Sequence, residues 1–416
     1  MNSVSNVKMI VGLILVLVIA VIGVGLLSRG PEEVPDNNQD QEPEVPTQPE
    51  PEPGEPEPQP EPTISRYDMI PADATLMTPE TDNYPPVLHS YLWEDPVILP
   101  GGINTAGVED SPFVSPDGNR FYFFFTPNAS VPAQEQLVDG VTGIWVSEKV
   151  NGVWTEATRV KLIENSGVAL DGCPYITPEE IWFCSARLGN YRGLDFWIGT
   201  LTEDGVVDIR NAGELLNSEI AVGEMHITPD GNTIYYHSDA PGGLGGMDIW
   251  AVERAGDTWG EPYNVEAVNS PENEGFPYIS PDGSEMWINR WYMGSPATYR
   301  SKLVDGDWTT PELIISSFAG EPNLDAEGNI YFTHHYMDNG RTIETDIYVA
   351  YRKPEITPAD TIIEPSRGYL LGTLPIPYDG QGFEEAYQYA SQTCELVPAW
   401  GKPSPYWEKA ADLEGD

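Results

Sequence analysis

The sequence predicts an all-β fold, a five-bladed β-propeller with four-stranded blades and N-terminal strand closure, preceded by one transmembrane helix and a disordered linker. A strand–turn–strand pattern recurs at a spacing of roughly 50 residues, which is typical of repeat architectures. The outer strand that the last copy lacks stands ahead of the first copy. The predicted divisions are an anchor over residues 1–29, a linker over 30–65, the propeller over 66–356 and a βαβ-like tail over 357–416.

Residues 9–27 contain no charged or strongly polar side chain. At a rise of about 1.5 Å per residue they span the roughly 30 Å hydrocarbon core of a bilayer. The alternative is a cleaved signal peptide, which usually has a shorter apolar stretch and small exit residues such as Gly23 and Gly25. The length favours a retained single-pass anchor in the cell membrane, with the N-terminus inside and the bulk of the chain extracytoplasmic.

The linker is rich in proline and acid: residues 31–62 contain eleven Pro, eleven Asp or Glu, and no Lys or Arg. Such a segment cannot bury enough apolar surface to offset the entropy of ordering it. The alternation of Pro and Glu predicts an extended spacer, the alternative being a Pro-rich ligand for a recognition domain. The whole chain has 66 acidic against 20 basic residues and a net charge of −46, which excludes nucleic acid as a partner because such binders need a basic face.

One turn recurs along the predicted propeller, at residues 115–118 (SPDG), 177–180 (TPEE), 228–231 (TPDG), 280–283 (SPDG) and 325–328 (DAEG). A short apolar strand precedes each turn, and an aromatic, β-prone strand such as FYFFF follows it. Proline presets φ for a turn and glycine adopts the left-handed conformation, so each copy predicts strand–turn–strand.

A third strand is marked by triplets such as Asp-Ile-Trp at residues 248–250, and a fourth by Trp with Pro three residues later, as at 259–262. The last copy has no fourth-strand signal after Tyr348, whereas Trp93 and Pro96 supply one before the first copy. A ring of blades closes in this way and removes an open sheet edge. The competing fold, a linear β-solenoid, does not predict the displaced strand.

This pattern resembles the WD-like repeats of TolB-type β-propellers over residues 84–354, and it departs from them at Glu180 and at 325–327. The resemblance implies a cell-envelope propeller that usually presents a binding surface, with no universal catalytic residue. The tail, from about residue 365, reads as strand, helix and strand, and weakly resembles the opening of (β/α)-barrel glycosidase-like domains. A full barrel needs about 250 residues, so we expect either a truncated domain or a segment that docks on the propeller.

Aligned inner strands place acidic side chains near the mouth of the central channel, where loops from all blades converge. The predicted ligand-binding residues are Glu109, Asp171, Glu224, His226, Glu274, Glu321 and Arg187. Paired carboxylates carry glycoside hydrolysis, one as acid and one as base or nucleophile, and the candidates for that role are Asp171, Glu224, Glu274 and Glu321. The competing interpretation is that these acids solvate the channel mouth or cap turns. No cofactor is indicated, although a bound calcium or sodium ion is another use for such carboxylates.

The alignment places His226 where other copies have Tyr175 or Tyr278, which predicts packing between blades. Arg187 and Arg290 follow the second strands of their blades, where we expect them to pair with an acid of a neighbouring blade; the alternative is an acidic ligand.

Cys173 and Cys184 lie on paired strands, and both a cross-strand disulfide in an oxidising compartment and two buried thiols remain open. Asn128 begins a glycosylation sequon, which fits a location outside the cell.

The sequence therefore predicts a membrane-anchored propeller that binds a protein or glycan ligand at the cell surface without catalysis of its own. The alternatives are a propeller glycoside hydrolase and a scaffold for a missing C-terminal catalytic domain. Carboxylates gathered around an open pocket would favour the enzyme. Carboxylates bonded to arginines or backbone N–H groups would favour the scaffold.

Overall fold

The structure is a computed structural model that describes residues 65–354, except for 116, 163–168, 192, 204, 218–223 and 257. The predicted membrane helix, nearly all of the linker and the βαβ-like tail lie outside the described residues. Within the described part of the chain, no helix is long and apolar enough to cross a membrane.

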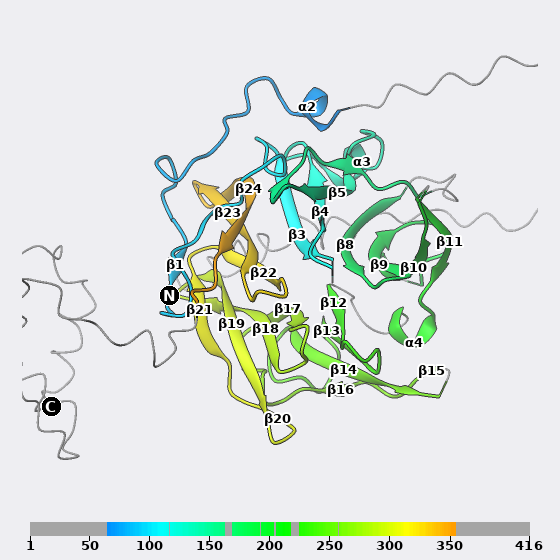
Figure 1. Ribbon diagram of the computed structural model, residues 1–416. Coiled ribbons are helices and arrows are strands. Elements are labelled where there is room, and N and C mark those ends of the chain that lie inside the picture. The colour runs from blue at the N-terminus through cyan, green and yellow to red at the C-terminus, as the bar shows by residue number, and fades with distance from the viewer. Residues whose placement is uncertain are drawn as a thin grey trace, which may run out of the picture. The chain divides into compact units, whose positions relative to one another are not determined.

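The described chain is all-β and consists of several sheets arranged around a common centre, as in a β-propeller (Figure 1). Each predicted turn joins two antiparallel strands: β3 (Val108–Val114) and β4 (Arg120–Thr126), β8 (Leu170–Ile176) and β9 (Glu180–Ala186), β12 (Met225–Ile227) and β13 (Thr233–Ser238), β17 (Glu274–Ile279) and β18 (Glu285–Tyr292), and β22 (Ala319–Leu324) and β23 (Ile330–Asp338). The predicted third strands follow as β5 (Gly143–Val150), β10 (Asp195–Leu201), β14 (Asp248–Ala255), β19 (Ser295–Val304) and β24 (Arg341–Ala350). The strand–turn–strand prediction is confirmed.

The outer strands are shorter and include the displaced one. They are β7 (Thr158–Arg159), β11 (Val206–Asn211), β16 (Tyr263–Asn264), β21 (Glu312–Ser316) and β2 (Val97–Ile98). β2 pairs antiparallel with β24, so the N-terminal segment completes the sheet that contains the last strand, as the sequence predicts. The Trp of the fourth-strand signal pairs separately, in β6 (Val153–Trp154), β15 (Thr258–Trp259) and β20 (Asp307–Trp308). In the last two, the proline that follows interrupts the ladder because it has no N–H to donate.

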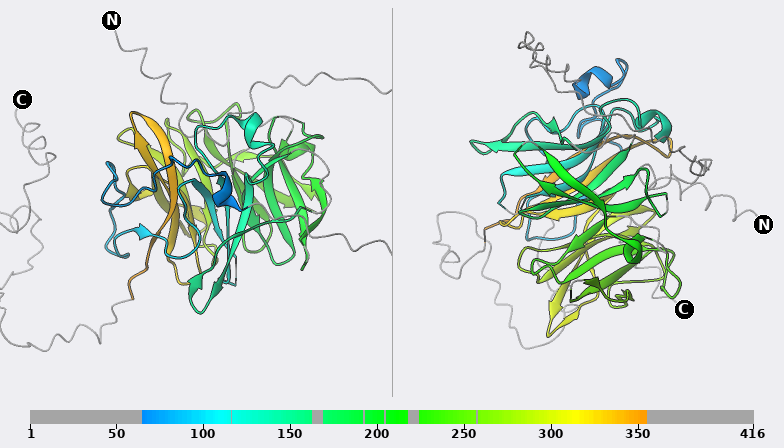
Figure 2. Two further views of the ribbon diagram at one scale, coloured as in Figure 1. Left: turned by 90° about the horizontal axis from the view of Figure 1, so that it is seen from above. Right: turned by 90° about the vertical axis from the view of Figure 1, so that its right-hand side faces the viewer.

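We refer to the strands in five sets: set 1 is β3, β4, β5 and β7; set 2 is β8–β11; set 3 is β12, β13, β14 and β16; set 4 is β17, β18, β19 and β21; set 5 is β22, β23, β24 and β2. Sets 5 and 1 join in one sheet through a single parallel pairing, Thr345 with Val108. An additional strand that the sequence did not predict, β1 (Val87–Leu88), pairs with β21. The left view of Figure 2 shows the molecule from above, and most strands in it run roughly along the direction from which Figure 1 is seen.

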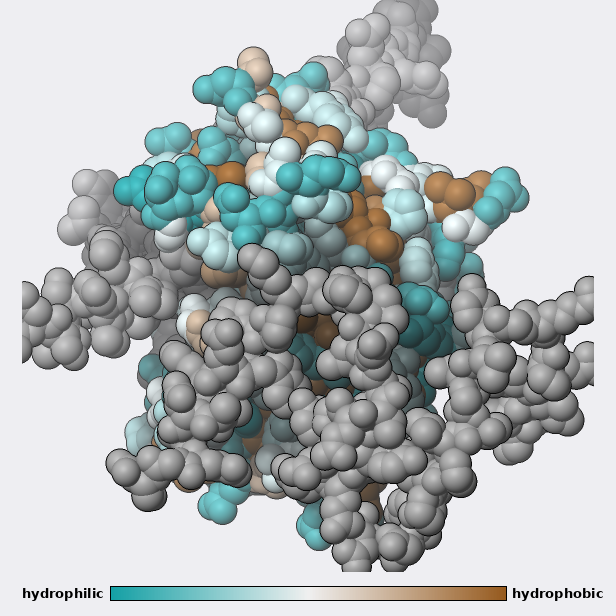
Figure 3. Space-filling model, turned by 90° about the vertical axis from the view of Figure 1, so that its left-hand side faces the viewer, coloured by the Kyte–Doolittle hydropathy of each residue, from teal (hydrophilic) through white to brown (hydrophobic). Residues whose placement is uncertain are grey.

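The core lies between the sets and consists largely of aromatic side chains from the second strands. Phe121, Phe123 and Phe125 alternate with other buried aromatics on β4 and are all inaccessible to solvent. Each such side chain contributes about 1.5–3 kcal/mol by leaving water. Hydrophilic residues cover much of the coloured surface in Figure 3, with apolar patches between them. Three short helices accompany the described sheets: α2 (Arg66–Met69), α3 (Ala133–Gln136) and α4 (Glu214–Asn217).

The inner strands share a β-bulge that shapes the centre of the molecule. Four residues that precede prolines adopt left-handed backbone conformations, with φ of 52° at Ser111, 53° at Cys173, 53° at Phe276 and 54° at Glu321. The ladder register shifts at each of them. A left-handed non-glycine residue costs about 1–2 kcal/mol, so its recurrence at equivalent places shows that the packing at the centre imposes it. The bulges bring these residues to the central cavity described next.

Candidate functional site

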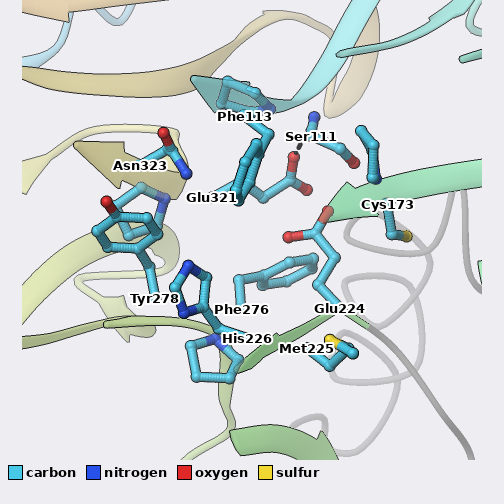
Figure 4. Close-up of a pocket in the computed structure, with 14 residues that line it drawn as sticks. Ser111, Phe113, Cys173, Glu224, Met225, His226, Phe276, Tyr278, Glu321 and Asn323 are labelled. Atoms are coloured by element: carbon cyan, nitrogen blue, oxygen red, sulfur yellow. Dashed lines mark hydrogen bonds between the residues drawn. The ribbon is translucent and has the colours of Figure 1, made fainter. Parts of the chain in front are cut away.

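A small cavity lies at the centre, where the bulges of the inner strands meet. Its volume is about 30 Å³. It is lined by Ser111, Phe113, Cys173, Glu224, Met225, His226, Phe276, Tyr278, Glu321, Asn323 and the four prolines at 112, 174, 277 and 322 (Figure 4). A space of this size holds about one or two water molecules. It does not admit a sugar ring.

Two of the predicted acids, Glu224 and Glu321, face each other across this cavity (Figure 4). Glu321 Oε2 accepts hydrogen bonds from the Ser111 N–H, at 2.8 Å, and from Thr333 Oγ1, at 3.1 Å. The same Ser111 N–H also donates to Asp110 Oδ1, at 3.0 Å, which brings a third carboxylate close to Glu321. Among the described ion pairs, none involves Asp110, Glu224 or Glu321.

Burial dominates the electrostatics of this group. It raises the pKa of the Glu224 carboxyl to about 8, and the nearby Asp110 carboxylate adds to the shift. Burial also raises the pKa of Glu321 well above its usual range, with further contributions from Asp110 and Glu224. The charged forms are disfavoured because burial removes the water that would otherwise solvate them.

The other predicted acids lie two residues earlier on their strands, and each pairs with a largely buried arginine. The pairs are Glu109 with Arg66 at 3.2 Å, Asp171 with Arg187, and Glu274 with Arg290 at 2.6 Å. The prediction that Arg187 and Arg290 pair with a neighbouring blade is therefore wrong. Each pairs within its own set, because the antiparallel hairpin brings the arginine back beside the acid, as the register of Glu274 opposite Arg290 shows.

Set 1 takes its arginine from outside the repeat. The residue opposite Glu109 is Phe125, which has no charge, and Arg66 of α2 supplies the missing cation. The Arg66 side chain is 1% exposed and also donates to the carbonyls of Gly102, at 2.7 Å, and Ile103, at 2.6 Å. The sequence did not predict the role of Arg66. The only signal was Phe125, an apolar residue at the position that Arg290 occupies in set 4.

Set 5 shows a comparable exchange, in which the basic side chain lies on the second strand and the acid comes from outside the repeat. Ala319 stands at the acid position of its inner strand, and His334 lies opposite. His334 Nε2 bonds with Oδ2 of Asp82, at 2.8 Å, and both side chains are almost fully buried. The segment of residues 65–84 therefore supplies a side-chain partner to set 1, Arg66, and another to set 5, Asp82.

A repeated asparagine, also missed from the sequence, fixes the third strands beside the inner ones. Asn269 Oδ1 accepts from the Ile249 N–H at 2.7 Å, and its Nδ2 donates to the Ile249 carbonyl at 2.8 Å. Asn217 and Asn104 make the same two contacts with Phe196 and Ile347. The signal was an Asn-Ser or Asn-Thr pair ahead of an inner strand, as at residues 104–105, 217–218 and 269–270.

His226 packs between neighbouring sets, as the sequence predicts. Its ring centroid lies 4.6 Å from that of Tyr175 and 4.5 Å from that of Tyr278. Nδ1 accepts a hydrogen bond from the Ile279 N–H at 3.3 Å. Burial lowers the pKa of His226 to about 3, so the ring is neutral at ordinary pH and acts as a hydrogen-bond acceptor between sets 3 and 4.

Cys173 and Cys184 are present as two thiols rather than as a disulfide. The bulge at Cys173 changes the register, and Cys184 lies opposite Gly172 instead. The adjacent Cys184 thiol and burial raise the pKa of Cys173 well above its usual range. Asn128 is half-buried, and its Oδ1 accepts from the Ser130 N–H at 2.8 Å; glycosylation there stays a prediction.

Among the side chains that the structure describes, no group of three or more His, Cys, Asp and Glu could hold a metal ion.

Comparison with known proteins gives no family. No protein-family model and no curated protein matches the chain. Similar solved structures include TolB from Acinetobacter baumannii, with 12% identity and a TM-score of 0.36 over 60% of this chain and 55% of TolB. The endo-arabinase from Bacteroides thetaiotaomicron VPI-5482 has 16% identity and a TM-score of 0.39, over 61% of this chain and 98% of that one. RS223-Beta-xylosidase has 11% identity and a TM-score of 0.40, over 64% and 96%.

The chain thus spans 55% of the length of TolB, the first of these proteins. At such identities and TM-scores, none of their activities is carried over to this chain. The β-propeller-like fold rests on the strand pairings and their arrangement around the centre. The TolB type of the repeat stays a prediction.

Proposed function

We propose that this chain is a membrane-anchored, extracytoplasmic β-propeller of five blades that binds a protein or glycan ligand and has no catalysis of its own. The proposal rests on the bonding partners and the surroundings of the acidic side chains on and beside the inner strands. Glu109, Asp171 and Glu274 are each bonded to an arginine. Glu224 and Glu321 line a cavity of about 30 Å³. The predicted acids thus serve the centre of the fold, which speaks against the hydrolase and is compatible with both the scaffold and the binding module. We assign ligand recognition to the surface loops.

The five blades correspond to the five strand sets. Each set contains an inner hairpin, a third strand and a short outer strand, and the pairing of β2 with β24 joins the N-terminal segment to the last set. Anchoring rests on the apolar run at residues 9–27, and the acidic, Pro-rich linker would hold the propeller away from the membrane.

A glycoside hydrolase is less well supported. Its two carboxyl groups must flank a sugar in a site open to substrate, and ligand pockets usually enclose about 300–1,000 Å³. Glu224 has the raised pKa that a general acid needs, but the cavity beside it is about a tenth of that size or less. Asp171 and Glu274 are held by Arg187 and Arg290 and do not reach it.

The direct test is binding of the full chain, in detergent, to glycan, cell-wall and envelope-protein arrays, with release of reducing sugar measured in parallel. We expect binding without release. The informative variants are Glu224→Gln and Glu321→Gln, and the matched control is Glu272→Gln, which removes an exposed charge just before the inner strand of set 4. Sugar release that the first two variants abolish and the control retains would establish a hydrolase.

The membrane part of the proposal has its own test. The full chain should sediment with membranes and resist extraction by high salt and alkaline carbonate, whereas a variant lacking residues 1–29 should be released. Protease added to intact cells should cleave the linker. Protection of the linker in intact cells, together with cleavage after lysis, would reverse the proposed orientation.

A further inference from the structure

Residues 65–84, which we call the strap, run from α2 toward β1 and contact sets 1 and 5; they are drawn in blue in Figure 1. The backbone–backbone hydrogen bonds described for the strap all lie within it, such as the one from the Asp82 N–H to the Thr78 carbonyl at 3.0 Å. The first residue after the strap that enters a sheet is Val87, in β1. The strap is therefore held on the propeller without a β-ladder, and such segments open more easily than the strands beneath them.

The strap is attached to the propeller at three places through charged or titratable side chains. Near its N-terminal end, Arg66 makes the contacts with set 1 described above. The Met77 N–H donates to both carboxylate oxygens of Glu344, at 2.9 and 3.1 Å. Asp82 Oδ2 contacts His334 Nε2 at 2.8 Å. The attachment of the strap therefore depends on the protonation of the groups that hold it.

The side chains beneath the strap form a buried acidic group where sets 5 and 1 join. Thr345 of β24 pairs with Val108 of β3, which places Glu344 and Asp346 close to Glu109. These three acids are each at most 1% exposed. Buried carboxylates at close range disfavour one another's charged forms.

The other groups that face these acids supply little positive charge. His334 lies opposite Asp346 in the ladder, so the two side chains share a face of the sheet. The Tyr336 hydroxyl bonds with Asp346 Oδ2 at 3.1 Å and with the Tyr348 hydroxyl at 2.9 Å. In the described part of the chain, His334 Nδ1 and Asp346 Oδ1 make no hydrogen bond. The described ion pairs give the group only Arg66 and, when it is protonated, His334 as positive charges.

We propose that the strap is a pH-sensitive device, closed over the junction of sets 5 and 1 in mild acid and opening as the pH rises. Opening would add its 20 residues to the linker, up to about 70 Å of fully extended chain. The propeller would then reach farther from the membrane at higher pH. This lengthened tether rests on the proposed membrane anchor, whereas the opening of the strap does not.

The direction of the switch follows from the burial of the acids. Burial raises the pKa of Glu344 from 4.5 to about 8 and that of Glu109 to about 7, and it raises the pKa of Asp346 well above its usual range. The closed form therefore binds protons that the open form, in which water reaches the acids, releases. Closure should weaken as the pH rises from 4.5 toward 8. The contact of Asp82 changes in the same direction, because it is an ion pair only while His334 is protonated.

The test is hydrogen exchange of the full chain in detergent between pH 5 and pH 8, corrected for the intrinsic pH dependence of exchange. The Met77 N–H reports on the strap, because it is bonded to Glu344, and the amides of β4 report on the propeller. We expect the opening equilibrium of the strap to rise about 10-fold per pH unit for each carboxyl that opening deprotonates, while β4 stays protected. Protection of Met77 that does not change with pH would overturn the proposal. So would an equal loss of protection in β4, which would indicate global unfolding.

A matched pair of variants assigns the effect to Glu344. Glu344→Gln stays uncharged and keeps an oxygen for the Met77 N–H, so it should reduce the pH dependence of opening by about 10-fold per pH unit. Asp73→Asn, which removes an exposed acid of the strap, should retain the wild-type profile. An unchanged profile in Glu344→Gln, or an equal change in Asp73→Asn, would contradict the proposal. The wild-type exchange profile decides the question even if Glu344→Gln fails to fold.

The lengthened tether has a separate measurement. Neutron reflectometry of the full chain in a supported bilayer should show the protein layer farther from the membrane at pH 8 than at pH 5. An unchanged height, together with loss of protection at Met77, would overturn the tether and count against the proposed anchor while the opening of the strap stands. An unchanged height with Met77 protected throughout would overturn the strap itself.

Discussion

Arg66 shows how much one residue outside the repeat contributes to the fold. It lies against Glu109, which is fully buried, and its guanidinium also stacks near Phe123, Phe125 and Trp145. Loss of the arginine would leave the Glu109 carboxylate without a cation, in a place where burial already raises its pKa to about 7. The N-terminal segment is therefore part of the propeller's stability, even though it precedes the first strand.

Arg66→Met should destabilise the chain by about 3–5 kcal/mol, the usual cost of removing one partner of a buried ion pair. Urea unfolding at neutral pH measures this. Arg120→Met is the control, because Arg120 and Glu148 form an exposed pair 3.8 Å apart and such pairs contribute about 0–1 kcal/mol. Adding Glu109→Gln to Arg66→Met should recover part of the loss. Equal effects of the two single arginine substitutions would contradict the role given to Arg66.

At the scale of the strand, local turn chemistry made the hairpins predictable. Each turn carries Pro, Asp or Gly at places that demand their conformations, and aromatic strands follow. The bulges were not predictable, because a residue before proline ordinarily favours extended backbone, and Ser111 and Cys173 show no local reason to be left-handed. Packing at the centre imposes that conformation. The roles of Arg66 and Asp82 were also not predictable, because both residues come from a segment that has no counterpart in the repeat.

The repeated asparagine is the element-scale feature that is simplest to test. Asn269→Ala would leave the Ile249 N–H buried without a partner, at a cost of about 1–3 kcal/mol. Asn232→Ala, in an exposed turn where Nδ2 bonds Asp230 at 3.0 Å, should cost well under about 1 kcal/mol. Thermal unfolding of both variants against wild type gives the comparison. A smaller loss for Asn269 than for Asn232 would show that the third strands do not depend on these contacts.

At the scale of the whole molecule, buried titratable groups make stability depend on pH in two directions. Burial lowers the pKa of His237 to about 4 from 6.5. The unfolded chain then binds the proton more readily than the folded one, so stability should fall as pH drops from about 6.5 toward 4. His237→Asn should reduce this loss of stability, measured as the fall in unfolding temperature between about pH 6.5 and pH 4. If the variant loses as much stability in acid as the wild-type chain, groups other than His237 cause the loss.

Glu344 acts in the opposite sense. Burial raises its pKa from 4.5 to about 8, although its carboxylate accepts from the Met77 N–H at 2.9 Å. The folded chain holds the proton longer than the unfolded one, so stability should fall as pH rises from 4.5 through about 8. Glu344→Gln should remove this loss and raise the unfolding temperature relative to wild type above pH 8. A variant that is destabilised equally at pH 5 and pH 9 would contradict the assignment.

The most direct measurement of the central claim is the simultaneous assay of binding and sugar release by the full chain on one set of glycans and cell-wall fragments. The claim is that the inner-strand acids hold the propeller together and do not catalyse. It predicts stoichiometric binding to at least one ligand with no release of reducing sugar. Release that disappears in Glu224→Gln or Glu321→Gln, while Glu272→Gln retains it, would contradict the account and assign these carboxylates to hydrolysis.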